Sequence, residues 1–258
     1  DQPKLTERSG WGLSAPDIEV QAAAYNPRHM VAVASHGVVL TRPGKGAVAI
    51  SGEVLRASIA NLDTRPRISI EGRKLAIAAA EGGQPMPFSA LDVFQMHVRS
   101  DKDHSAKFFV GLEGAVATPG SLMSRVTDAK TNLRLEAVLT SANMLKGADW
   151  PGLLQHWAAA NGEMRIGRAE AQVGEAILSA TDSDLRVDGE GRLHGKLDLR
   201  LRKGPDAMMA LGATGVLPPE TAAVAAGLAG KEAHIELSFA GGQARIGPFP
   251  IGRAPKLY

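Results

Sequence analysis

Hydrophobic and polar residues alternate most regularly between Asp184 and Arg202. In the first part of this stretch Leu185 and Val187 alternate with charged residues, and Gly189-Glu190-Gly191 then supplies a turn. The second part alternates polar residues with four leucines: Leu193, Leu197, Leu199 and Leu201. Because successive side chains of a strand point to opposite sides, the pattern predicts a β-hairpin with one packed and one solvated face.

Similar strands, separated by clusters of turn residues, are predicted along the whole chain. They cover residues 11–25, 29–41, 47–60, 67–80, 88–99, 107–117, 133–139, 163–173, 175–181, 234–239 and 244–246. Proline cannot donate a hydrogen bond to a neighbouring strand, so Tyr25-Asn26-Pro27-Arg28 is predicted as a turn between the first two strands. The strands of the first half are predicted to form an antiparallel meander.

Helical signals are few. Asp149 has the side chain of an N-cap and Asn161-Gly162 is a stop signal, so a helix is predicted between them. Trp150 and Trp157 are seven residues apart, on one helical face, where they are predicted to anchor a core. Two further helices are predicted over residues 205–212 and 219–228.

These elements predict a mainly β protein with a few short helices, a β-rich α+β fold. The expected architecture is a long curved antiparallel sheet, or two sheets, covered by helices. The length of 258 residues fits one β-rich domain, 1–258, or two lobes at about 1–148 and 149–258.

Composition removes several classes of function. The chain has no cysteine, which excludes disulfides, thiolate metal sites and thiol catalysis. Its net charge of +2 comes from 29 basic and 27 acidic residues that are interspersed, and aromatic residues make up only 4%. Nucleic-acid binding needs clustered cations or exposed aromatic platforms, so no nucleic-acid partner is expected.

Candidate chemistry is sparse. The seven histidines are scattered, and no serine lies in a Gly-x-Ser-x-Gly turn. Asp182, Asp184 and Asp188 are similar to a calcium loop, but the twelfth position is Leu193 instead of glutamate. We therefore predict a protein that is not an enzyme, with no catalytic, cofactor-binding or metal-binding residues and no cofactor.

One segment is a candidate ligand site. Met208, Met209 and Leu211 offer flexible apolar side chains next to a predicted sheet, which suits a core gap or an acyl-chain groove. We name these three residues as the candidate apolar groove.

Four stretches carry a resemblance to a known family. They are Trp11-Gly12-Leu13-Ser14-Ala15-Pro16, Tyr25-Asn26-Pro27-Arg28-His29 with the Val-Ala-Val-Ala after it, Gly195-Lys196-Leu197-Asp198-Leu199-Arg200, and Arg245-Ile246-Gly247-Pro248-Phe249-Pro250-Ile251-Gly252. In this order they resemble the bacterial family catalogued as domain of unknown function 2125. The resemblance implies a cell-envelope protein, in which a β-rich periplasmic domain follows an N-terminal hydrophobic segment, and it implies no activity.

The start of the chain fits this expectation. No stretch approaches the roughly 18 apolar residues of a transmembrane helix, and the sequence begins at Asp1 instead of methionine. We interpret this as the loss of an N-terminal segment, either a signal peptide or a membrane anchor. The expected location is the periplasm, with the full-length protein anchored to the inner membrane in the second case.

Two functional hypotheses follow. The first is a non-enzymatic periplasmic protein that binds or shields a lipid or another amphiphile at the cell envelope. The alternative is a structural or assembly partner of an inner-membrane complex, with a membrane-protein partner and no small-molecule ligand. A lipid-binding protein needs accessible apolar volume, whereas an assembly partner needs a filled core and an exposed apolar patch.

Overall fold

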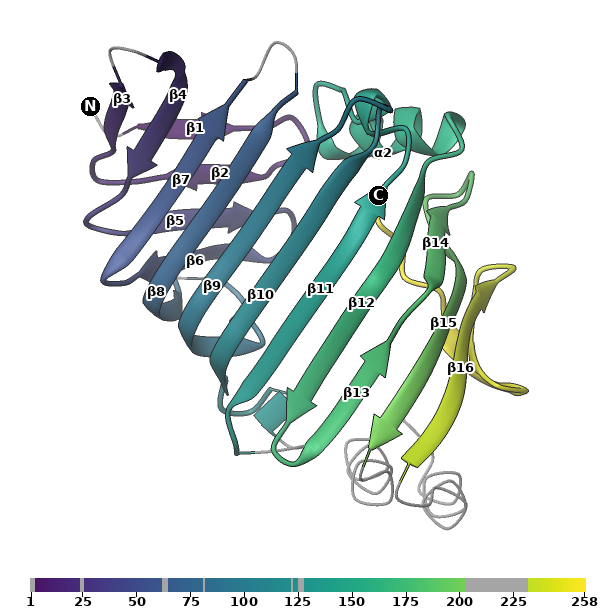
Figure 1. Cartoon of the computed structure of the whole chain (residues 1–258). Coiled ribbons are helices and arrows are strands. Elements are labelled where there is room, and N and C mark those ends of the chain that lie inside the picture. Colours follow the sequence, from purple (N-terminus) through teal and green to yellow (C-terminus); the bar gives the residue numbers. More distant parts are fainter. Residues whose placement is uncertain are drawn as a thin grey trace.

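The computed structural model describes residues 3–23, 26–61, 65–80, 82–121, 123–124, 128–202 and 232–258. Within these ranges the chain forms 18 strands that belong to one sheet, and every strand pair is antiparallel. This confirms the prediction of a mainly β fold. A covering of helices is not found in these ranges, because their longest helix, α2 (Trp150–Ala159), lies at one end of the sheet (Figure 1). The two helices predicted over residues 205–228 lie outside the described residues.

Five long strands form a meander at the centre of the sheet. They are β8 (Arg67–Ala79), β9 (Phe88–Ser100), β10 (Ala106–Ala117), β11 (Thr131–Leu139) and β12 (Glu163–Val173). Each pairs with the next along the chain, as the alternation of apolar and polar residues predicts. A 3-10 turn, η1 (Ala142–Met144), and α2 form the connection between β11 and β12.

The C-terminal half continues this order. β13 (Ala176–Ala180) and β14 (Ser183–Val187) occupy successive parts of one position between β12 and β15 (Leu193–Arg202). Asp182, between them, has a φ of 50°, so the strand is interrupted there. β16 (Glu232–Ala240), β17 (Gln243–Ile246) and β18 (Phe249–Arg253) complete the sheet. The sequence pattern did not predict β18.

The N-terminal strands do not form the predicted meander, because the sheet forks at β8. One branch pairs with residues 67–73 of β8 and consists of β7 (Val54–Ala60), β4 (Asn26–Val33) and β3 (Glu19–Ala23). The other pairs with residues 76–79 and consists of β6 (Gly46–Ser51), β5 (Val38–Arg42), β2 (Gly12–Ser14) and β1 (Lys4–Thr6). We call this second branch the N-terminal arm, and Figure 1 shows it behind the long strands and at a steep angle to them.

Close packing at the fork explains why one predicted strand, 47–60, is two strands. Gly52 separates β6 from β7, and a Cβ at this position would lie 2.6 Å from Cδ2 of Leu75. Lys74, just before this leucine, has a φ of 50°, which bends β8 between its two partners. The two strands therefore leave the same edge of β8 in different directions.

The predicted turn at Pro27 is wrong, because this proline lies inside β4. The register of β3 and β4 shifts between Ala22 and Ala23, opposite the segment that contains Pro27. β7 pairs with β4 only from His29 onwards. Neither neighbour therefore needs the N–H that proline lacks, as is usual for proline in strands.

The predicted hairpin is confirmed as β14 and β15. Gly191 has a φ of 79° and donates its N–H to the carbonyl of Asp188 over 3.0 Å. Asp188 Oδ1 accepts from the backbone N–H of Arg192, so this acid forms a turn and is not part of a calcium loop. The four leucines of β15 share one face, on which Leu201 is fully buried and the other three are half-buried.

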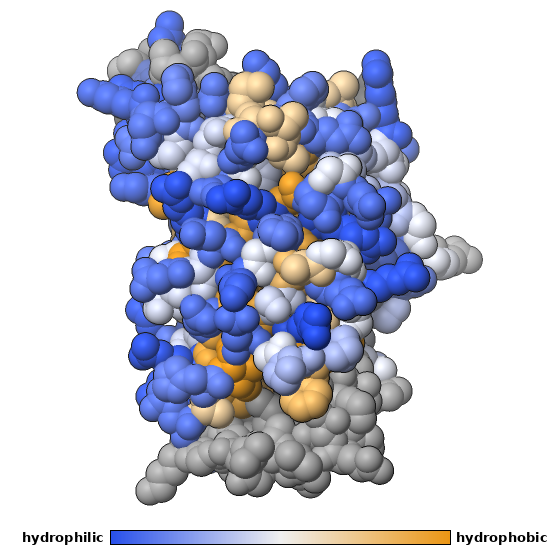
Figure 2. Space-filling model, turned by 90° about the vertical axis from the view of Figure 1, so that its right-hand side faces the viewer, coloured by the Kyte–Doolittle hydropathy of each residue, from blue (hydrophilic) through white to orange (hydrophobic). Residues whose placement is uncertain are grey.

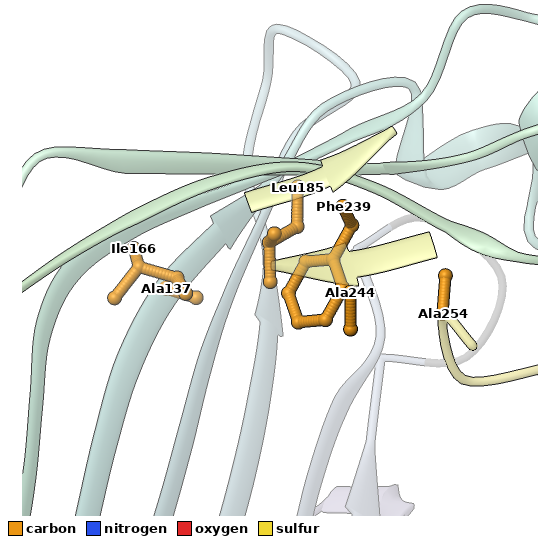
Figure 3. Close-up of a cluster of buried hydrophobic side chains, with 6 residues drawn as sticks. All are labelled: Ala137, Ile166, Leu185, Phe239, Ala244 and Ala254. Carbon is orange, nitrogen blue, oxygen red and sulfur yellow. The ribbon is translucent and has the colours of Figure 1, made fainter. Parts of the chain in front are cut away.

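The hydrophobic core is divided among separate clusters. The largest described cluster joins the sheet to the C-terminal strands and contains Ala137, Ile166, Leu185, Phe239, Ala244 and Ala254 (Figure 3). A second lies at the fork around Leu75, Leu91 and Ala115. A third packs α2 onto β14 through Leu154, Trp157 and Val187. Two of these clusters therefore pack against separate parts of the long strands, one at the fork and one beside the C-terminal strands.

Candidate functional site

One face of the sheet, which we call the inner face, carries three apolar rows that cross the strands. Residues directly opposite each other on neighbouring strands point to the same face. The middle row runs through eleven strands in unbroken register: Val20, Ala32, Ala57, Ile70, Met96, Val110, Leu135, Ala169, Ala180, Leu199 and Ile235. Every residue in it is apolar.

A flanking row lies on each side of the middle row. One contains Ala22, Met30, Ile59, Ile68, Val98, Phe108, Ala137 and Ile166. The other contains Leu55, Gly72, Phe94, Leu112, Leu133, Ala171, Leu178, Leu201 and Ala233. The three rows contain no ionisable side chain, so their surface offers dispersion contacts and no hydrogen bonds.

The middle row stays partly accessible to solvent although neighbouring strands lie on both sides of it. Ile70, Met96 and Val110 are half-buried at the centre of the sheet, and Ala180 is the only fully buried member of the row. At the free edge Val20 is 62% exposed. A sheet face that another layer packs against closely would bury such central residues, as protein interiors are close-packed.

The inner face is closed at both ends. At the fork, Ile50 of β6 packs into the cluster that includes Phe94 and Leu112 of the inner face. At the other end, Ile251 of β18 packs against the cluster that contains Ala137 and Ile166, whose side chains project to one side of the sheet in Figure 3. The accessible part therefore lies between two packed ends.

The N-terminal arm continues the apolar surface. Its own row, paired onto Ala79 of β8, is Val48, Leu40, Leu13 and Leu5. The exposed fraction rises along this row, from 0% at Val48 to 39% at Leu13 and 72% at Leu5. The apolar surface of the arm thus becomes open towards its free edge.

The far end of the arm reaches α2. The Glu7 carboxylate accepts a hydrogen bond from the backbone N–H of Trp150, the first residue of the helix. A carboxylate is also favoured electrostatically at a helix N-terminus. The arm therefore extends from the fork at β8 to the opposite end of the long strands. Figure 2, which views the molecule from the right-hand side of Figure 1, shows separate apolar patches among hydrophilic side chains.

The opposite, outer face is charged and solvated. Its cross-strand neighbours include the ion pairs Arg56–Glu71, at 2.5 Å, and Lys196–Glu236, at 3.1 Å. The Glu170 carboxylate raises the pKa of Arg168 through a hydrogen bond. Exposed pairs of this kind contribute little to stability, so this face is mainly solvating.

Phe109 interrupts the charged surface of the outer face. Its ring stacks on His97 with the centroids 5.7 Å apart, and the Arg134 guanidinium carbon lies 5.6 Å from its centroid. A depression of about 340 Å³ opens on each side of the ring, one reaching Glu170 and the other Lys107. Phe109, His97 and Arg134 pack against one another. The two depressions beside them are open and shallow compared with the enclosed pockets that usually bind small molecules.

The residues predicted from the sequence as a groove, Met208, Met209 and Leu211, lie outside the described residues. The described histidines are not gathered with acids into a metal site, and no cluster of metal-ligating residues occurs in the ranges that the structure covers. His194 and His234 are exposed on polar positions of β15 and β16, as the alternation predicts.

One prediction near the site is wrong in part. Trp157 is buried and anchors the α2 cluster, as predicted, but Trp150 is 46% exposed. As the first residue of the helix, Trp150 turns its indole to the C-terminal segment and donates its N–H to the Leu257 carbonyl over 2.9 Å. Helical spacing places two residues on one face but does not say whether that face is covered at its first turn.

Sequence reasoning missed the three rows of the inner face. Alternation along each strand was visible, but the rows depend on which residues stand opposite each other on neighbouring strands. The pairing of Val110 with Met96 and Leu135 follows from the register and is not written in any one segment.

The family comparison covers nearly the whole chain. Residues 1–255 match the family described as "Uncharacterized protein conserved in bacteria (DUF2125)". No curated protein and no solved structure matches the chain. Within the described residues, no helix has the length and apolar character needed to cross a membrane.

Proposed function

The chain belongs to the DUF2125 family of uncharacterized bacterial proteins, and we propose that its inner face binds the acyl chain of a lipid or another amphiphile. In this proposal the protein carries or shields its ligand and performs no reaction on it. The cell envelope, and the periplasm in particular, is the proposed setting, and this part rests on the family resemblance alone.

The observation that carries the proposal is the middle row of the inner face. A hydrocarbon chain needs a continuous apolar surface with no polar group to desolvate, and the row supplies eleven apolar residues in register. The central members are also accessible, as a binding surface must be.

The dimensions fit a single chain. From Ala57 on β7 to Ala169 on β12 the row crosses five inter-strand steps of about 4.8 Å, or about 24 Å. One acyl chain spans half of the hydrocarbon core of a bilayer, about 15 Å. An acyl chain is therefore shorter than the apolar row that it would follow across the strands.

The available free energy is sufficient. Transfer of a 16-carbon chain from water is worth about 12 kcal/mol at about 0.8 kcal/mol per methylene. The loss of translational and conformational freedom on binding opposes a large part of this. Micromolar binding, which corresponds to about 8 kcal/mol, lies within the remaining range.

The alternative, an assembly partner without a small ligand, differs in what covers the inner face. A partner protein would cover the rows with its own side chains, and the purified protein would then bind no amphiphile. The same experiment therefore separates the two hypotheses.

The test is a titration with a linear fluorescent fatty acid, cis-parinaric acid, of the wild-type protein, Val110→Asp and Val138→Asp. Both valines are half-buried residues of the same sheet, but Val138 pairs with Lys107 and Arg165 on the outer face. A buried unpaired carboxylate beside an acyl chain is costly, so Val110→Asp should weaken binding by about tenfold or more while Val138→Asp does not.

Thermal melts of all three proteins show whether each is folded, and Val110→Phe, which fills volume without adding charge, is a second blocking variant. Binding lost in Val110→Asp and Val110→Phe but kept in Val138→Asp supports the proposal. Failure of the folded wild type to bind, or an equal loss in Val138→Asp, contradicts it and favours the assembly partner.

A further inference from the structure

An exposed apolar patch lies where the N-terminal arm meets α2. It consists of Leu5, Trp11, Leu13 and Trp150, with exposed fractions of 72%, 39%, 39% and 46%. Leu5 and Leu13 are direct cross-strand neighbours on β1 and β2. We call these four residues the tip patch.

Hydrogen bonds through Glu7 hold the two parts of the patch together. The Glu7 backbone N–H donates to the Trp11 carbonyl over 2.8 Å, and the Glu7 side chain accepts from the backbone N–H of Trp150. The Trp150 indole N–H is bound to the Leu257 carbonyl, so the ring has a fixed orientation. Both tryptophans are therefore held beside the same glutamate and remain accessible to solvent.

Four exposed cations lie on the segments that carry or adjoin the tip patch: Lys4, Arg8, Lys146 and Lys256. Lys4 and Arg8 adjoin Leu5 and Glu7 in sequence. Lys146 is beside α2, because its carbonyl is 2.8 Å from His156 Nδ1, and Lys256 precedes Leu257. None of the four forms an ion pair with another described residue.

The acids near the patch accept hydrogen bonds from backbone N–H groups. Glu7 accepts from the Trp150 backbone, and Asp149 accepts from the Gly152 N–H over 2.8 Å as the N-cap of α2. Both carboxylates keep their charge, but they are half-buried, whereas the four cations are exposed, so positive charge is in excess around the patch. The whole chain, by comparison, carries a net charge of only +2.

We propose that the tip patch docks on the surface of an anionic lipid bilayer. Tryptophan favours the boundary between hydrocarbon and headgroups, because its ring is apolar and its N–H is polar. The leucines add apolar area, and each cation near an anionic membrane surface contributes about 1 kcal/mol, or about a fivefold change in affinity. The four cations and four apolar residues together give the two forces that hold a protein at a membrane interface.

Docking is a second activity, separate from acyl-chain binding, and it would orient the inner face relative to the bilayer. The apolar row of the arm ends at Leu13 and Leu5, so the tip patch is continuous with the apolar surface that leads to the inner face. A docked protein would present that open edge to the bilayer. Docking and acyl-chain binding use different residues and can fail separately.

The test is co-sedimentation with vesicles of phosphatidylglycerol and phosphatidylcholine, and with vesicles of phosphatidylcholine alone. The wild type should bind the anionic vesicles and lose affinity as salt is raised. Lys4→Gln with Arg8→Gln should weaken binding by about 25-fold. Arg99→Gln with Lys107→Gln, two exposed cations of the outer face, is the matched control and should change binding little.

The three tryptophans give a second readout. Phospholipids brominated on the acyl chain quench nearby indoles, so Trp11 and Trp150 should be quenched in single-tryptophan variants while Trp157, which is 4% exposed, should not. Val110→Asp should still sediment with anionic vesicles even where it has lost the fatty acid.

No binding of anionic vesicles by the wild type would overturn the proposal. An equal loss in the outer-face control pair, or quenching without preference for Trp11 and Trp150, would overturn it as well.

Discussion

Asp92 on β9 shows how a single side chain holds a bend in the sheet. Its carboxylate lies 3.0 Å from Nζ of Lys74, which is on β8. It also lies 2.5 Å from Nζ of Lys130, which is just before β11. A side chain at Gly114, whose φ is 63°, would collide with it. The hydrogen bonds from Lys130 and then Lys74 lower the pKa of Asp92, and Asp92 in turn raises the pKa of Lys74.

These shifts predict a dependence of stability on pH. A carboxyl whose pKa is lowered on folding stabilises the protein above its ordinary pKa of about 3.9, and this contribution is lost as the pH falls through the folded value. Asp92→Asn should therefore lower the melting temperature at pH 7 and have little effect at a pH of about 2. Thermal melts across this range measure the difference, and the same deficit at both pH values would show that the charge of Asp92 is not what matters.

At the scale of elements, α2 shows what local sequence predicts well. Asp149, Pro151 and the stop at Asn161-Gly162 are neighbours in sequence, so the helix was predictable from one short segment, and the structure confirms it. The predicted strand 29–41 is also two strands, β4 and β5, with Gly37 just before β5. Neither this break nor the one at Gly52 was predictable, because a side chain at these glycines would meet Ile50 or Leu75, which are distant in sequence. β18 was missed because Pro250 argues against a strand, whereas an edge position tolerates a proline.

The N-cap of α2 gives a test at this scale. Asp149→Ala removes the acceptor for the Gly152 N–H and should cost about 1 kcal/mol of stability. Because Leu154 and Trp157 pack α2 against β14, the loss should appear in the global unfolding measured by urea denaturation. Asp149→Asn and Asp149→Ser, which keep an acceptor, are the controls and should recover most of it; an unchanged midpoint in Asp149→Ala would show that the cap does not stabilise the fold.

At the scale of the whole molecule, the sheet has a solvated outer face and an apolar inner face. Within the described residues, other elements pack onto the inner face only at its two ends. The alternation along β15 predicted such two-sidedness for one hairpin. What the sequence could not show is that the same side of eleven strands lines up, because the fork at β8 and the register shifts are set by contacts between distant segments. The candidate groove at Met208, Met209 and Leu211 lies outside the described residues, so the proposed site rests on other residues altogether.

The central claim, that an acyl chain lies across the strands of the inner face, is tested most directly by photo-crosslinking. The protein is irradiated with a fatty acid that carries a diazirine in mid-chain, and the modified residues are located by tandem mass spectrometry. The account predicts adducts on the central rows, at positions such as Ile70, Met96 and Val110, and their loss when excess unlabelled fatty acid is added. Adducts concentrated on outer-face residues such as Arg99 and Phe109, or inner-face adducts that excess fatty acid does not displace, would contradict it.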